Sequence, residues 1–245
     1  MKKNRYFIGA LMMALLIFLA ACDNSSETAN NIPTPSNIPG AHFKKFPDRK
    51  YVRSVASSVL KFSCNAYSHG KIEDSWSSHC CLYSNKDGWS YLALPRHCFP
   101  FDSTKRYEAW VTDSKGRTIK LSLVTELHSN EYDAAILVVK RIKGLRTLCE
   151  REMISSQQIS GDSAILLVPF NARDVYQKPG LLLDGPKVEM STLRCEPGDS
   201  GGLIVGRDGV IGVEVSGSNY GKIMHFVPIS VFEDIYGTLV NKFGK

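Results

Sequence analysis

A serine inside a glycine-rich turn is the clearest sign of chemistry in this chain of 245 residues. Residues 196–202 read EPGDSGG, with Ser200 as the candidate nucleophile. A serine that attacks a carbonyl needs hydrogen-bond donors where negative charge develops on the oxygen. Gly198, two residues earlier, lets the backbone turn, so that its amide and that of Ser200 can face one oxygen. A plain glycine turn is the alternative interpretation.

The GDSGG motif resembles the nucleophile motif of the trypsin-like (chymotrypsin-fold) serine peptidases, and the longer run CEPGDSGG resembles their streptogrisin-like bacterial branch. This resemblance implies a histidine followed by a cysteine, which His97 and Cys98 supply. It also implies an aspartate that opens an apolar strand, which Asp133 supplies. In this family the aspartate fixes the tautomer of the histidine, which is the base for the serine. The order His97, Asp133, Ser200 differs from that of subtilisins and α/β-hydrolases.

Two departures from the family pattern bear on the site. Pro95 and Arg96 stand directly before His97, where the family usually has small residues. The expected mature chain lacks the apolar N-terminus that pairs in trypsin with the aspartate before the serine, so Asp199 needs another partner. We therefore expect no trypsin-like zymogen switch. The alternative function is a catalytically silent protein of this fold that serves as a peptide-binding or interaction module.

The resemblance implies a serine endopeptidase that acts on peptides or proteins and needs no metal or cofactor. An extended substrate would pair with the strand that ends near Ser216 and Gly217. The pocket for the substrate side chain would lie between the residues before Ser200 and those after Gly217. Arg194 and Lys222 would line this pocket and favour an acidic side chain. The alternative is that both are solvated surface charges.

Seven cysteines agree with export to an oxidising compartment. Six lie in the expected folded domain: Cys64, Cys80, Cys81, Cys98, Cys149 and Cys195. Zinc binding is the alternative to disulfides, but the spacing fits no zinc template. The resemblance implies that Cys98 pairs with Cys80 or Cys81, and the spacing favours Cys81. Cys195 would then pair with Cys149, and Cys64 with the remaining cysteine.

The N-terminus has the pattern of an export signal with a lipid-attachment site. Basic residues precede an apolar run at residues 6–20, whose 15 residues are short for a membrane span of about 20. Small residues then precede Cys22, which resembles the lipidated cysteine of bacterial lipoproteins. Asp23 resembles the signal that retains such proteins in the inner membrane, facing the periplasm, in a Gram-negative host. An ordinary secretory signal is the alternative.

The chain divides into a signal peptide (residues 1–21), a disordered tether (22–40) and a folded domain (41–245). The tether is poor in apolar residues, so it cannot offset the entropy lost on ordering. The signal peptide holds three cations and no acid, so its removal lowers the net charge from +6 to +3. That excess is too small to indicate nucleic-acid binding. We expect a monomer anchored to the membrane by lipid.

Short apolar or alternating runs between turn signals predict an all-β fold. The runs lie at residues 90–94, 107–112, 119–125, 134–139, 164–168, 202–205, 210–215 and 223–227. Turn signals at residues 87–88, 115–116 and 208–209 separate some of these runs. A capping box from Ser230 to Glu233, followed by an apolar stripe, predicts a C-terminal helix. With the resemblance, these elements imply two antiparallel six-stranded β-barrels and a C-terminal helix.

Overall fold

The structure is a computed structural model that describes residues 49–99, 101–148, 153, 162–169, 175–183, 189–191, 195–206, 208–218 and 223–243. The predicted signal peptide, lipidated Cys22 and tether lie outside these residues. Among the described helices, none has the length and apolar character needed to span a membrane.

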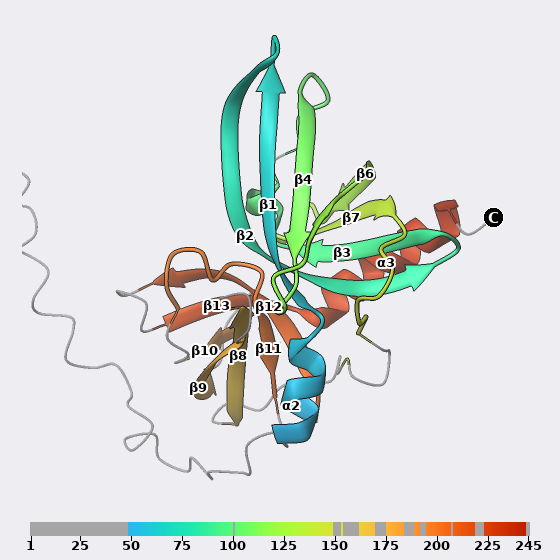
Figure 1. The fold of residues 1–245 in the computed structure, drawn as a ribbon. Coiled ribbons are helices and arrows are strands. Elements are labelled where there is room, and N and C mark those ends of the chain that lie inside the picture. The colour runs from blue at the N-terminus through green and yellow to red at the C-terminus, as the bar shows by residue number, and fades with distance from the viewer. Residues whose placement is uncertain are drawn as a thin grey trace, which may run out of the picture. The chain divides into compact units, whose positions relative to one another are not determined.

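The N-terminal half of the described chain forms one antiparallel sheet (Figure 1). Helix α2 (Arg49–Ala56) precedes it, and the short 3-10 helix η4 (Arg96–Cys98) follows its third strand. The strands are β1 (Val59–Ser68), β2 (Lys71–Lys86), β3 (Trp89–Leu94), β4 (Arg106–Thr112), β5 (Thr118–Lys120), β6 (Leu123–His128) and β7 (Ala135–Lys140). Their order in the sheet is β5-β4-β1-β2-β3-β7-β6.

This sheet has seven strands rather than the six expected, because one segment is divided into two strands. β5 pairs with β4 at one edge of the sheet, and β6 pairs with β7 at the other. Only Leu121 and Ser122 separate β5 from β6. The Leu121 amide donates to the Ala109 carbonyl, and the Lys140 amide donates to the Ser122 carbonyl. The continuous segment 118–128 therefore joins the two edges, as a sixth barrel strand would.

The second half forms a closed six-stranded barrel, as predicted. Its strands are β8 (Ser163–Pro169), β9 (Val175–Leu183), β10 (Glu189–Ser191), β11 (Leu203–Val205), β12 (Val210–Ser218) and β13 (Ile223–Pro228). The order is β10-β13-β12-β11-β8-β9. Each predicted apolar run overlaps a strand of one sheet or the other. The Asp87-Gly88 turn joins β2 to β3 with both residues at positive φ, 49° and 82°, as a tight hairpin requires.

The apolar side chains form three cores, two inside the sheets and one between them. The first-sheet core includes Leu60, Phe62, Leu92, Leu94 and Leu137. The second-barrel core includes Leu166, Ile204, Ile211 and Phe226. The third core, which we call the seam, combines residues of both sheets such as Tyr91, Ile136, Leu167, Leu203 and Val213. The seam therefore holds the two sheets together.

Both described α-helices pack into the seam. Helix α3 (Ile229–Phe243) contributes Phe232, Ile235 and Leu239, and it contacts β6, β7, β12 and β13. It begins at Ile229, so Ser230 lies in its first turn rather than before it. α2 was not predicted, because eight residues are too few to show a convincing helical period. It contributes Val52 and Val55 to the seam.

Truncating Phe232 tests the role of α3 in the seam. This side chain is fully buried, so Phe232→Ala is expected to lower the free energy of unfolding by roughly 3–5 kcal/mol. Asn241→Ala, at an exposed position of the same helix, should change it by less than about 0.5 kcal/mol. Chemical denaturation measures both values. Equal losses in the two variants would contradict the packing role of α3.

Candidate active site

The pairing of β3 with β7 brings His97 next to Asp133. The register sets Leu94, the last residue of β3, opposite Ala135, the first residue of β7. His97 lies three residues beyond the end of β3, in η4, and Asp133 lies two residues before β7. Both residues therefore emerge from the same end of the strand pair. Pro95 fits this turn, because its φ of −61° and ψ of 140° form the N-terminal cap of η4.

Two hydrogen bonds join His97 to Asp133. The ring Nδ1 lies 2.5 Å from Oδ2 of Asp133, and the backbone amide of His97 donates to Oδ1 at 2.9 Å. The amide contact holds the carboxylate in place, while the ring contact fixes the orientation of the imidazole. The two side chains are 50% and 37% exposed, so a substrate can reach them. These two hydrogen bonds hold the His97 ring against the Asp133 carboxylate.

The same contacts shift both pKa values. The hydrogen bond that the His97 ring donates to Asp133, and then the contact with Cys98, raise the pKa of His97 to about 10. Burial by itself would raise the pKa of Asp133, but hydrogen bonds from the His97 ring and amide bring it below its ordinary value. In this arrangement His97 carries a proton at neutral pH. It acts as a base only after that proton has been lost.

The other ring nitrogen of His97 contacts a neighbouring thiol. Its Nε2 lies 3.3 Å from Sγ of Cys98. The Ser200 hydroxyl donates to the backbone carbonyl of Val215 at 3.3 Å. Within the described residues, no hydrogen bond joins His97 to Ser200. The structure therefore contains the His97–Asp133 part of the predicted triad, with Ser200 held by β12.

Two glycines allow the Ser200 loop to approach β2 and β8. Gly201 has φ +91°, and a Cβ there would lie 1.8 Å from the carbonyl oxygen of His79. A Cβ on Gly202 would lie 2.6 Å from Val168. The His79 amide donates to the Ser200 carbonyl at 2.7 Å. The first sheet thus holds the backbone of the serine that the second barrel carries.

Gly198 and Ser200, whose amides are the predicted oxyanion donors, lie in the glycine-rich loop before β11. Gly198 has φ +97°, which favours glycine, and it is exposed. Neither amide donates to any acceptor within the described residues, whereas the neighbouring Asp199 amide donates to Glu196. The buried Asp199 carboxylate accepts a hydrogen bond from the Glu196 amide at 2.7 Å. This contact supplies a partner that does not depend on a free chain terminus.

The strand predicted to bind substrate has one open edge. β12 pairs with β11 only as far as Val213, while its pairing with β13 continues through Ser216 and Gly217. Ser216 and Gly217 are exposed, and a Cβ on Gly217 would lie 2.1 Å from Sγ of Cys195. Cys195 therefore packs directly beneath this edge. The predicted pocket residues Arg194 and Lys222 lie outside the described residues.

No disulfide joins any two of the described cysteines. The preferred pairing of Cys98 with Cys81 does not fit their placement, because Cys98 lies in the first-sheet core and Cys81 in the seam. Adjacent strand residues point to opposite faces, so Cys80 faces the first-sheet core with Cys98 and Cys64. Burial raises the pKa of Cys80 well above its ordinary value, and nearby Cys81 and Cys98 raise it further. Cys149 lies outside the described residues.

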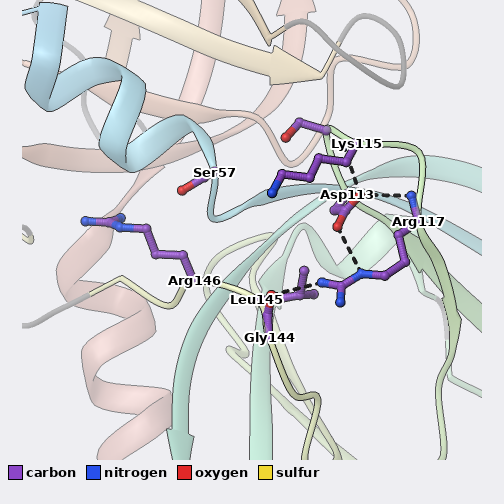
Figure 2. Close-up of a pocket in the computed structure, with 8 residues that line it drawn as sticks. Ser57, Asp113, Lys115, Arg117, Gly144, Leu145 and Arg146 are labelled. Atoms are coloured by element: carbon purple, nitrogen blue, oxygen red, sulfur yellow. Dashed lines mark hydrogen bonds and ion pairs between the residues drawn. The ribbon is translucent and has the colours of Figure 1, made fainter.

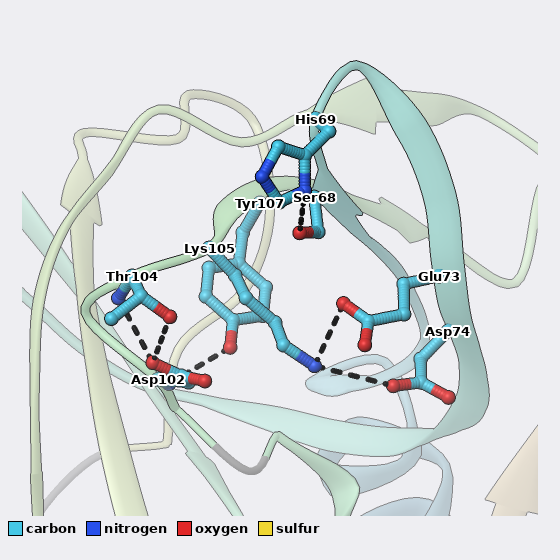
Figure 3. A network of polar contacts seen from close by, with 8 residues as sticks. All are labelled: Ser68, His69, Glu73, Asp74, Asp102, Thr104, Lys105 and Tyr107. Carbon is cyan, nitrogen blue, oxygen red and sulfur yellow. Dashed lines mark hydrogen bonds and ion pairs between the residues drawn. The ribbon is translucent and has the colours of Figure 1, made fainter.

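A polar network ties the loop after η4 to the β1–β2 hairpin (Figure 3). The Lys105 ammonium lies 3.1 Å from the Glu73 carboxylate and 3.5 Å from that of Asp74. In the same loop, the Asp102 amide donates to the Tyr107 hydroxyl at 2.8 Å. Exposed ion pairs contribute little stability. Their main effect here is to restrict the loop that follows His97.

The sequence did not reveal two backbone groups that position Ser200. These are the His79 amide, which binds the Ser200 carbonyl, and the Val215 carbonyl, which accepts the Ser200 hydroxyl. Both depend on how strands from distant parts of the chain meet. The side chains of His79 and Val215 do not indicate which contacts their main-chain groups make. Only the three-dimensional arrangement could identify them.

Comparisons with known proteins agree with this arrangement at the level of fold. No protein-family profile and no curated protein matches the chain. Two structures of the HtrA-type protease AlgW with a tripeptide match 78% of it, one of them a variant. The variant has 17% sequence identity to this chain and a TM-score of 0.59. The other structure has 18% sequence identity and a TM-score of 0.58. This chain spans 62% of each of those chains. It therefore has the chymotrypsin-like all-β fold of HtrA-type serine proteases.

Adding a methyl group at Gly201 tests the close approach of the two sheets. Gly201→Ala is expected to lower the free energy of unfolding by roughly 2–4 kcal/mol, because alanine is strained at positive φ and would also collide with His79. Gly237→Ala is the control, since a Cβ there meets nothing within 4 Å. Thermal and chemical unfolding measure the two effects. A neutral Gly201→Ala would show that the loop does not pack as described.

Replacing Cys98 tests the thiol contact with His97. Because Cys98 raises the pKa of His97, Cys98→Ala should lower it. With a lower pKa, His97 of the variant loses its proton at a lower pH than His97 of the wild type. The variant should therefore react with a fluorophosphonate at lower pH. The measurement is the labelling rate from about pH 6 to pH 10 in reducing buffer. Cys64→Ala serves as the control. Equal pH midpoints in wild type and Cys98→Ala would contradict the role of the contact.

Proposed function

We propose that this protein is a serine endopeptidase that hydrolyses peptide bonds through His97, Asp133 and Ser200. The observation that carries the proposal is the hydrogen-bonded His97–Asp133 pair at the end of the β3–β7 ladder. Ser200 belongs to the glycine loop that contacts β2 through His79. A peptidase needs both parts on a rigid frame, because small displacements of reacting groups reduce rates strongly.

In the proposed reaction, neutral His97 accepts the Ser200 hydroxyl proton at Nε2 while Oγ attacks the substrate carbonyl carbon. Asp133 stabilises the imidazolium that forms. The amides of Gly198 and Ser200 donate to the oxyanion of the tetrahedral intermediate. His97 then protonates the leaving amine, and water attacks the acyl-enzyme with His97 again as base. The first step requires the Ser200 hydroxyl to turn from Val215 towards His97.

We propose that the substrate binds as an added strand along β12. Glu214 still bonds through its amide and carbonyl to Gly202 and Gly201, so the edge that can offer main-chain groups to an extended peptide lies beyond it, at the exposed Ser216 and Gly217. The structural neighbours were solved with a tripeptide, which is compatible with peptide binding. A preference for an acidic side chain, through Arg194 and Lys222, is part of this proposal. Cleavage rates of glutamyl, alanyl and leucyl peptides compare the alternatives.

Export and anchoring complete the proposal. The lipobox-like sequence at Cys22 favours a bacterial lipoprotein held at the membrane by its acylated N-terminus, with the peptidase domain in the cell envelope. An inner-membrane position facing the periplasm follows for a Gram-negative host. In that oxidising compartment we propose a Cys80–Cys98 disulfide, because both thiols face one core. A disulfide at Cys98 agrees with the resemblance to the streptogrisin-like branch. Membership of that branch is itself still a prediction.

A catalytically silent binding module is the second candidate. The observation that favours it is the present state of the site, in which Nε2 of His97 contacts Cys98 and the Ser200 hydroxyl is bonded to Val215. If these contacts persist, the protein binds peptides along β12 without cleaving them. The two candidates differ in one property, which is the reactivity of Ser200.

Labelling by a fluorophosphonate distinguishes the two functions. The wild type is expected to gain one covalent adduct by intact mass, and Ser200→Ala none. Asp133→Asn should react roughly 10⁴-fold more slowly, because the histidine loses its correct tautomer. The protein is expressed in an oxidising compartment, and circular dichroism shows that each variant is folded. A folded wild type that gains no adduct would favour the binding module.

A further inference from the structure

The first sheet carries a surface cavity of about 380 Å³ that none of His97, Asp133 and Ser200 lines. It lies between the end of α2, the β4–β5 turn and the segment after β7 (Figure 2). Its polar lining consists of Ser57, Asp113, Ser114, Lys115, Arg117 and Arg146. The lining therefore has three cationic side chains and one carboxylate. The following contacts show that this carboxylate does not balance the cations.

The Asp113 carboxylate is committed to its own turn. It is buried, and its Oδ1 accepts hydrogen bonds from the amides of Lys115 and Arg117, each at 2.9 Å. Its Oδ2 accepts a hydrogen bond from Nε of Arg117 at 3.1 Å. Both oxygens thus point into the β4–β5 turn. Asp113 shapes the turn and forms an ion pair with Arg117, so it does not balance the charge of Lys115.

Arg117 is held in position with donors to spare. Its Nη2 donates to the Gly144 carbonyl at 2.9 Å, so Asp113 and Gly144 fix both sides of the guanidinium. A guanidinium has five N–H donors, and these contacts use two of them. The remaining donors are carried by a group that is already ordered. A ligand that binds them loses little side-chain entropy of the protein.

Lys115 supplies a second cation with no ion pair among the described residues. Its side chain is exposed, and in Figure 2 it extends towards the side of the cavity formed by Ser57 and Arg146. The Ser114 hydroxyl adds a neutral donor to the lining. Residues 140–146, which lead into this wall, read KRIKGLR and contain four cations and no acid. The electrostatic field at the cavity therefore favours an anion.

We propose that this cavity is a binding site for a phosphate group. A single carboxylate would be satisfied by one guanidinium. Here a guanidinium that is held in place and a mobile ammonium line one cavity, together with Ser114. A tetrahedral dianion has acceptor oxygens on all sides and matches such a set of donors better. The phosphate comes either from solution or from the headgroup of an anionic phospholipid, and the two sources share this chemistry.

Calorimetric titration of the full chain with inorganic phosphate tests the proposal. Saturable binding is expected, and Lys115→Gln should weaken it about tenfold, as expected for one lost charge-assisted hydrogen bond. Arg146→Gln is a second variant on the opposite wall. Lys71→Gln, an exposed charge in the β1–β2 hairpin, is the matched control and should bind as the wild type does. No saturable binding, or equal weakening in Lys71→Gln, would overturn the proposal.

Short-chain, water-soluble phospholipids distinguish the two sources. If dihexanoyl phosphatidylglycerol binds and displaces phosphate while dihexanoyl phosphatidylcholine does not, the site takes a lipid headgroup. If only inorganic phosphate binds, the source is solution. The site does not rest on peptidase activity, so Ser200→Ala should bind phosphate unchanged. Phosphate binding thus tests the cavity and fluorophosphonate labelling tests the proposed peptidase, and the result of one does not determine the result of the other.

Discussion

The register between β3 and β7 is the constraint on which the site depends. Leu94 opposite Ala135 sets the ends of two strands side by side, and the hydrogen-bonded pair of His97 and Asp133 follows from that position. A slip by one residue would turn the buried side chains of β7 towards the opposite face. In the observed register, Ile136 packs in the seam and Leu137 in the first-sheet core. Packing of β7 in the seam and in the first-sheet core therefore positions His97 and Asp133 at the ends of the two strands.

The second half of the site must reach this point from another sheet. The seam brings β11 and β12 against the first sheet, and glycines allow backbone to meet backbone at His79 and Ser200. The Ser200 loop is held mainly by main-chain contacts, so its geometry tolerates changes in many side chains. This explains how a chain at 17–18% identity can retain the fold of HtrA-type proteases.

The contact between His97 and Cys98 links the site to the redox state of the chain. As a thiol, Cys98 lies against the ring nitrogen that must accept the Ser200 proton. In the proposed Cys80–Cys98 disulfide, this sulfur would be bonded to Cys80 and would no longer be a thiol. The thiol contact with His97 would then exist only in a reducing compartment. The same contact accounts for the binding-module alternative.

Much of the site could be predicted because its chemistry is local in sequence. The GDSGG loop, the His97–Cys98 pair and the Asp133 strand are short motifs, and the final helix has a clear apolar period. Properties that depend on strand register could not be predicted. The faces of Cys80 and Cys81 follow from the pairing of β2, and the break between β5 and β6 follows from sheet closure. β2 also lacks strict alternation, because its first residues are exposed in the hairpin that extends beyond the core, whereas β1 does alternate from Lys61 to Tyr67.

We propose that His97 and Ser200 form one reactive unit on this frame. A crystal structure of the protein after treatment with a fluorophosphonate tests it most directly. We expect the phosphorus bonded to Oγ of Ser200, one phosphonyl oxygen accepting hydrogen bonds from the amides of Gly198 and Ser200, and His97 turned from Cys98 towards the adduct. An unmodified Ser200, with His97 still against Cys98, would contradict the claim.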